Sequence, residues 1–161
     1  MDYPTRRPNR LPHFDYSTLG AYFITICTKN RQKIFWENVG ASIARPQPPQ
    51  LSRAGILAAQ AVQNIEHHYP AISVDHYVVM PNHIHLLLQI NTDENGRPMV
   101  APTISTVIQQ MKGFVSKQLG VSIWQKLFHD HVIRNEHDYR IIWEYIDNNP
   151  AQWELDCFYS D

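Results

Sequence analysis

Residues 81–90 constrain the fold most, because they place two histidines inside an otherwise apolar run. On a β-strand, residues i and i+2 point to the same face of the sheet. His83 and His85 would therefore project side by side from one face, and the apolar side chains between and after them would project from the other. The run predicts a strand with one core face and one face that can carry a metal site.

The segments around this run predict a complete small domain. Strands are expected at 20–28, 73–80 and 126–134, and amphipathic helices at 52–68, 103–119 and 136–148. The order strand, helix, strand, strand, helix, strand matches the ferredoxin-like βαββαβ arrangement. We therefore predict an α+β fold, in which two helices cover one face of an antiparallel sheet. An additional C-terminal helix, which carries Tyr145, would dock on the other face, next to His83 and His85.

Composition limits the other classes of protein. The 161 residues suit a single domain, here 20–161, after an extended basic N-terminal arm at 1–19. No apolar run approaches the roughly 20 residues of a membrane-spanning helix, and the N-terminus has no apolar signal segment. Two cysteines, Cys27 and Cys157, form neither a disulfide framework nor a zinc motif, which favours a reduced, cytoplasmic protein.

The expected last helix supplies a candidate nucleophile. Tyr145 and Asn149 are four residues apart and share a helical face. Tyrosine can attack a phosphodiester when a metal neutralises charge on the phosphate, and the Asn149 oxygen can bind that metal. Tyr139 is the rival nucleophile, but six residues place it roughly 120° around the helix from Tyr145. Four residues after Tyr139 comes Trp143, which is no metal ligand, so we prefer Tyr145 and assign Tyr139 to the packing stripe.

A second histidine pair and several cations remain open in their roles. His129 and His131 alternate on the last expected strand, as a rival metal pair, a DNA-contacting pair, or ordinary polar residues near an active face. The net charge of −1 does not indicate a nucleic-acid binder, although basic residues gather near the N-terminus. The cations that could reach phosphates, or could simply be solvated, are Arg6, Arg7, Arg10, Lys112, Lys117 and Arg134.

Several longer motifs resemble those of a known family. They are Gly20-Ala-Tyr-Phe-Ile-Thr-Ile-Cys-Thr28, Val78-Val-Met-Pro-Asn-His-Ile-His85, Phe128-His-Asp-His-Val-Ile-Arg134, Asp138-Tyr-Arg140, Tyr145-Ile146 and Asn148-Asn149-Pro150. Over nearly its whole length the chain resembles the single-tyrosine HUH transposases, and within them the REP-associated tyrosine transposases. This resemblance implies Tyr145 as the nucleophile and His83, His85 and Asn149 as ligands of Mg²⁺ or Mn²⁺.

The resemblance also implies a reaction and a substrate. It predicts a metal-dependent transposase that cleaves and rejoins single-stranded DNA at palindromic hairpins, through a 5′-phosphotyrosine and a free 3′-OH. The protein would act as a monomer or homodimer, without a membrane. One alternative is a domesticated protein that binds hairpin DNA without cutting it. Another is a hydrolase of small phosphoesters, in which the pairing of Tyr145 with Asn149 would have no evident purpose.

Overall fold

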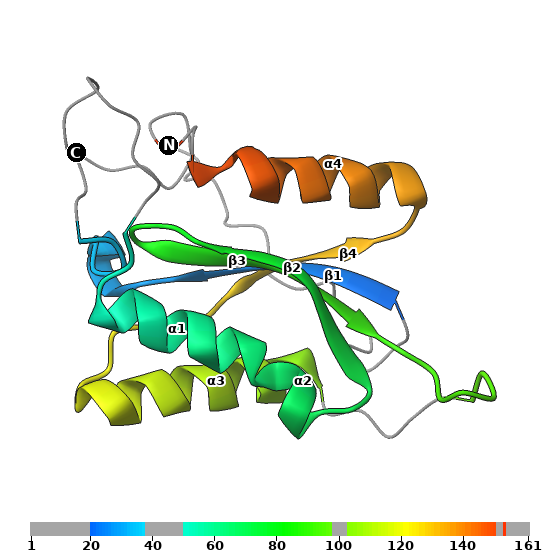
Figure 1. Cartoon of the computed structure of the whole chain (residues 1–161), viewed down its shortest axis with the longest axis horizontal. Helices are drawn as coiled ribbons and strands as arrows, with labels where there is room; N and C mark the ends of the chain where they lie inside the picture. The colour runs from blue at the N-terminus through cyan, green and yellow to red at the C-terminus, as the bar shows by residue number, and fades with distance from the viewer. Residues whose placement is uncertain (1–19, 38–49, 98–102, 151–152, 154–161) are drawn as a thin grey trace, which may run out of the picture.

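Four antiparallel strands and two helical layers make up the computed structural model, which describes residues 20–37, 50–97, 103–150 and 153 (Figure 1). The expected N-terminal arm, 1–19, lies outside the described residues. The elements in chain order are β1 (Gly20–Cys27), a 3₁₀ turn η1 (Lys29–Arg31), α1 (Arg53–Gln63), α2 (Ile65–His68), β2 (Ile72–Val79), β3 (His83–Ile90), α3 (Ile104–Leu119), β4 (His129–Ile133) and α4 (Glu136–Asn148).

The sheet has the strand order β2-β3-β1-β4, and every neighbouring pair is antiparallel. This is the order of the ferredoxin-like βαββαβ arrangement, so the predicted α+β fold is confirmed. β4 begins at His129, three residues later than expected. Upstream of it, Trp124 forms an isolated bridge with Thr28, and the Gln125 N–H donates to the Cys27 carbonyl at 2.9 Å.

The layer of α1, α2 and α3 covers the apolar face of β3. Ile84, Leu86 and Leu88 are fully buried there, as the alternation predicts. Ser52 caps α1 by accepting the Gly55 N–H, and the expected single helix 52–68 is divided at Asn64 into α1 and α2. Gly55 suits a close approach that the sequence does not reveal, because a Cβ there would lie 2.2 Å from the Phe35 carbonyl oxygen.

The helix α4 covers the opposite face of the sheet (Figure 1). Asn135 caps it by accepting the Asp138 N–H, as its sequence predicts. Its apolar contact is small, and is centred on Leu87 of β3 with Ile142 and Ile146 of α4. Among the described residues, no helix is long and apolar enough to cross a lipid bilayer.

Polar contacts supplement this small apolar patch. The Tyr139 hydroxyl donates to Asp75 Oδ2 at 2.8 Å, and His76 Nε2 lies 2.6 Å from Asp147 Oδ1. The register of β2 against β3 shifts between Val74 and His76. Such a bulge lets two consecutive residues reach the same side, whereas a regular strand would alternate them. Asp75 and His76 can therefore both contact α4.

Candidate active site

The two histidines of β3 lie beneath α4, and neither is exposed to solvent. His83 is 0% exposed and His85 is 1% exposed, which agrees with the predicted docking of the last helix on this face of the sheet. Their rings meet at an angle of 70°, and their Nε2 atoms are 3.0 Å apart. In this arrangement one Nε2–H donates to the other nitrogen.

The outer nitrogen of each ring has its own buried partner. His83 Nδ1 lies 2.7 Å from Asn82 Oδ1, and because an amide oxygen only accepts, this nitrogen carries the proton. His85 Nδ1 lies 2.8 Å from the hydroxyl of Thr25, which can donate or accept. Contacts of this kind fix the orientation of an imidazole and aim its second nitrogen, as they do in metal sites. Both Nε2 atoms are thereby held facing each other.

Tyr145 lies beside this pair. Its ring centroid is 5.2 Å from that of His85, and it meets the ring of Phe23 edge-on at 6.1 Å. The side chain comes from α4, whereas Phe23 and His85 come from β1 and β3. Tyr145 is 38% exposed, so a substrate can approach it from solvent although the neighbouring imidazoles are buried.

Asn149 follows one turn later, at the end of α4, and is 3% exposed. Within the described part of the chain, neither its Oδ1 nor its Nδ2 has a hydrogen-bond partner. Trp153, a little further on, packs its ring 5.9 Å from that of His83. The chain from Tyr145 to Trp153 therefore runs from the His85 ring to the His83 ring, and Asn149 lies between them in sequence.

These residues fit a divalent cation. Ligand atoms at adjacent corners of an octahedron, with bonds of about 2.1 Å, lie about 3.0 Å apart. The two Nε2 atoms have this spacing, and the buried Asn149 oxygen needs a partner. No cluster of three or more His, Cys, Asp or Glu residues able to hold a metal occurs in the described ranges. Among the described residues, the unpartnered amide oxygen of Asn149 is a polar atom that could complete such a site.

Tyr139 has a different environment. Burial and the hydrogen bond to Asp75 raise the pKa of Tyr139 to about 12. Its hydroxyl therefore stays protonated and occupied at neutral pH, which makes a poor nucleophile. The two tyrosines contact different strands, β2 for Tyr139 and β1 and β3 for Tyr145, as the angle between them around the helix predicts.

The second histidine pair shares a sheet face with the first. Direct partners across antiparallel strands point to the same side, and Thr25 pairs with both His85 and His129. His131 pairs with Phe23, and its Nε2 lies 2.8 Å from Asp138 Oδ2 of α4. Both histidines are exposed, and their roles in DNA contact stay predictions.

The predicted phosphate-binding cations are not gathered at this site. Lys112 and Lys117 lie on α3, across the sheet from Tyr145, and the Lys112 ammonium donates to the Gln125 carbonyl at 2.9 Å. Arg134 is exposed just after β4. The remaining three, Arg6, Arg7 and Arg10, lie outside the described residues.

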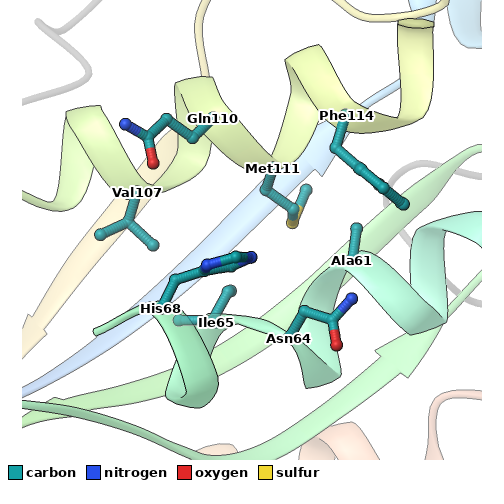
Figure 2. Close-up of a pocket in the computed structure, with 8 residues that line it drawn as sticks. All are labelled: Ala61, Asn64, Ile65, His68, Val107, Gln110, Met111 and Phe114. Carbon is teal, nitrogen blue, oxygen red and sulfur yellow. The ribbon is translucent and has the colours of Figure 1, made fainter. Parts of the chain in front are cut away.

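A cavity of about 200 Å³ lies on the side of the sheet away from α4 (Figure 2). Ile65 and His68 of α2 line it, together with Met111 and Phe114 of α3. It is a gap between packed helices and holds none of the candidate catalytic side chains.

Sequence reasoning missed the residues that orient the imidazoles. Asn82 is 0% exposed and precedes His83 directly, so its position next to the pair was an available signal. Thr25 and His85 are 60 residues apart in the chain, and they meet only because β1 pairs with β3. Trp153 likewise contacts His83 through the tertiary fold alone.

Comparison with known proteins finds relatives that match nearly the whole chain. No protein-family model matches the chain. A protein of Haemophilus influenzae without an assigned function is 33% identical, over 97% of this chain and 94% of its own length. A second protein of the same organism, named as a candidate REP-associated tyrosine transposase, is 23% identical over 91% of this chain and 84% of its own.

Solved structures agree on the fold. A REP-associated tyrosine transposase solved with a bound REP hairpin superposes with a TM-score of 0.64 and 21% identity, covering 91% of this chain and 74% of that one. Sequence similarity over almost the full length places the chain in one family with the 33% identical protein of Haemophilus influenzae. In sequence and in fold, the chain is similar to the REP-associated tyrosine transposases.

Proposed function

We propose that this chain cleaves and rejoins single-stranded DNA at hairpin elements, with Tyr145 as the nucleophile and a divalent cation held by His83, His85 and Asn149. The observation that carries the proposal is the position of the Tyr145 ring, 5.2 Å from His85, whose Nε2 faces that of His83 at 3.0 Å. A nucleophile and a pair of ligand atoms thus meet at one partly exposed point.

In the proposed reaction, Tyr145 forms and then breaks a covalent bond to the DNA. The Tyr145 hydroxyl releases its proton to solvent as its oxygen attacks phosphorus. The bond from phosphorus to the 3′ oxygen breaks, and that oxygen takes up a proton from solvent and leaves as a 3′-OH. The 5′ side of the break stays on Tyr145 as a phosphotyrosine. Attack by a second 3′-OH reverses these steps, joins the strands and restores the phenol. A bound Mg²⁺ or Mn²⁺ would supply Lewis-acid stabilisation of the phosphate charge.

Tyr145 and Asn149 owe their relative position to one helical turn, and Thr25 and Asn82 fix the imidazoles. A rigid arrangement of this kind reduces the entropy lost in aligning the nucleophile with the phosphate. The hairpin substrate is inferred from the related structure, which was solved with a REP hairpin bound. DNA would approach the site at Tyr145, which is 38% exposed, because both imidazoles are buried.

Cleavage of a labelled hairpin oligonucleotide, taken from palindromes next to the gene, tests the proposal. With Mn²⁺ present, the wild type should release a fragment that a DNA polymerase can extend, which identifies the 3′-OH. A chelator should stop the reaction. His85→Ala should reduce it by about 100-fold or more, because the loss of a group that only orients a metal ligand already costs about 10–100-fold. His68→Ala, in the helical layer across the sheet, is the matched control.

Two results would contradict the proposal. Full cleavage by His85→Ala would remove the metal assignment. Tight hairpin binding by the wild type, with no cleavage under any divalent metal, would favour the alternative of a protein that binds hairpin DNA without cutting it.

A further inference from the structure

The turn η1, Lys29–Arg31, has an unusual backbone for its sequence. Asn30 has φ 56° and Arg31 has φ 54°, and among the described residues these are the non-glycine residues with positive φ. Left-handed backbone brings Cβ too close to the carbonyl oxygen of an L-residue. Asparagine tolerates this conformation better than arginine does. Two such residues in succession mark a strained turn.

The strain does not serve core packing. None of the three residues of η1 is buried, and all are exposed to solvent. Strained backbone persists where surrounding structure holds it, and it gathers at binding and catalytic sites. An exposed, strained turn with a cation at each end therefore points to a ligand outside the protein.

The surrounding structure does hold this turn. The Lys29 N–H donates to the Ile123 carbonyl at 2.8 Å, and the Arg31 N–H donates to the Thr28 carbonyl at 3.1 Å. The Thr28 N–H in turn donates to the Asn82 carbonyl at 2.9 Å. Contacts from two separate segments thus fix the backbone that carries Lys29 and Arg31.

One residue joins this turn to the candidate active site. Asn82 Nδ2 donates to the Arg31 carbonyl at 3.5 Å, and Asn82 Oδ1 accepts from His83 Nδ1 at 2.7 Å. In Figure 1 the turn after β1 lies at the same end of the sheet as the C-terminal end of α4. The two cations are therefore held at the end of the sheet where His83 and Asn149 lie.

Charge on α4 favours a role for such cations in DNA binding. The helix α4 carries Glu136, Asp138, Glu144 and Asp147 against Arg140 alone, so it repels a phosphate backbone. The candidate metal ligands are two imidazoles and an amide, so a bound divalent cation would supply positive charge at the scissile phosphate and none along the neighbouring strand. Exposed Lys and Arg side chains on a rigid turn would supply that charge, and an arginine can bind a phosphate through two N–H groups.

We propose that the turn Lys29–Arg31 binds the phosphate backbone of the single strand next to the scissile phosphate. This inference rests on the proposed function for the location of the scissile phosphate. The strained backbone directs both cations outward into solvent, and Asn82 fixes the distance between the turn Lys29–Arg31 and the imidazole pair.

Salt-dependent binding tests the role of the two cations. The background is Tyr145→Phe, which cannot form the covalent link, and the probe is a fluorescent hairpin oligonucleotide followed by anisotropy. In that background, Lys29→Gln and Arg31→Gln should each weaken binding severalfold and lower the slope of log affinity against log salt by about 0.7. Arg97→Gln, at an exposed cation beyond the end of β3 that is remote from His83, is the matched control and should change neither quantity. A double variant of Lys29 and Arg31 with unchanged affinity and slope would overturn the inference.

The strain argument has its own test. Arg31→Gly should raise the Tm, because glycine adopts positive φ readily, and should lower DNA affinity by as much as Arg31→Gln does. A lower Tm for Arg31→Gly would overturn the argument from strain. These readouts need no cleavage, so a protein that binds through this turn but never cuts would sink the proposed function and leave the inference standing. If the wild type cleaves DNA while the Lys29→Gln and Arg31→Gln variants keep the salt slope of their background, the proposed function would stand and the inference would be overturned.

Discussion

The replacement of Asn149 by leucine should stabilise this protein. The side chain is 3% exposed, and both of its amide atoms lack hydrogen-bond partners within the described residues. A buried polar group without a partner costs about 1–3 kcal/mol. Leucine has a similar size and no polar atom, so Asn149→Leu should raise the free energy of unfolding by about 2 kcal/mol. For a chain of this length that corresponds to a rise in Tm of roughly 4–8 °C.

The same substitution at Asn82 is the control, and it should have the opposite sign. Asn82 is 0% exposed, and its amide contacts both His83 Nδ1 and the Arg31 carbonyl. Asn82→Leu would leave the His83 N–H buried without a partner, and should lower the free energy of unfolding by about 2 kcal/mol or more.

Urea unfolding and thermal denaturation would measure both changes, with and without Mn²⁺. A metal that binds the folded wild type should raise its Tm in proportion to affinity and concentration. Asn149→Leu should show a smaller metal-induced shift despite its higher starting Tm. If Asn149→Leu were destabilised as much as Asn82→Leu, the amide of Asn149 would have hydrogen-bond partners within the protein. The argument that its oxygen is available to bind a cation would then be refuted.

Three further predictions follow from single contacts. The pKa of Tyr139 is raised to about 12 from 10.0, so the stability gained from its protonated hydroxyl is complete below pH 10 and is lost as pH rises through 12. Titration by ultraviolet absorbance should show one late-titrating tyrosine fewer in Tyr139→Phe than in the wild type, and an equal number in the two proteins would contradict the assignment. Ile146 is 1% exposed, and Ile146→Ala should lower the free energy of unfolding in urea by about 2–5 kcal/mol. It should also reduce DNA cleavage, because the apolar contact that holds α4 on the sheet is small. Ile146→Val should lower the free energy of unfolding by only about 0.5–1.5 kcal/mol and keep most of the cleavage activity. Equal losses in the two variants would contradict this view of α4 packing. Gly55→Ala should cost about 1–3 kcal/mol despite the better helix propensity of alanine, because its Cβ meets the Phe35 carbonyl oxygen, and wild-type stability would show that the helix can shift.

Local patterns predicted much of this fold. Alternation in β3 separated Ile84 and Leu86 from His83 and His85, and the sheet places the two sets on opposite faces. The assignment of Tyr139 to the packing stripe of α4 likewise predicted its contact with the sheet, where it packs beside Ile142 and donates to Asp75. These predictions succeeded because the faces of a strand or helix follow from its period, which the sequence carries directly.

Contacts that depend on strand pairing could not be predicted in this way. Asp75 and His76 both reach α4 because β2 has a bulge, and a bulge is a property of two paired strands. Thr25 contacts His85 only because of the register between β1 and β3. The positive φ of Arg31 had no sequence signal, because arginine rarely adopts it. The chemical roles of Tyr145 and Asn149 stay predictions on the same ground, since spacing and position alone support them.

The covalent intermediate tests the central claim most directly. Purified wild type, Tyr145→Phe and Tyr139→Phe would each be mixed with labelled hairpin DNA, with Mn²⁺ or with a chelator, and run on a denaturing gel. We predict a metal-dependent protein–DNA adduct for the wild type and for Tyr139→Phe, and none for Tyr145→Phe. An adduct at the wild-type level in Tyr145→Phe, together with its loss in Tyr139→Phe, would contradict the account and move the nucleophile to Tyr139.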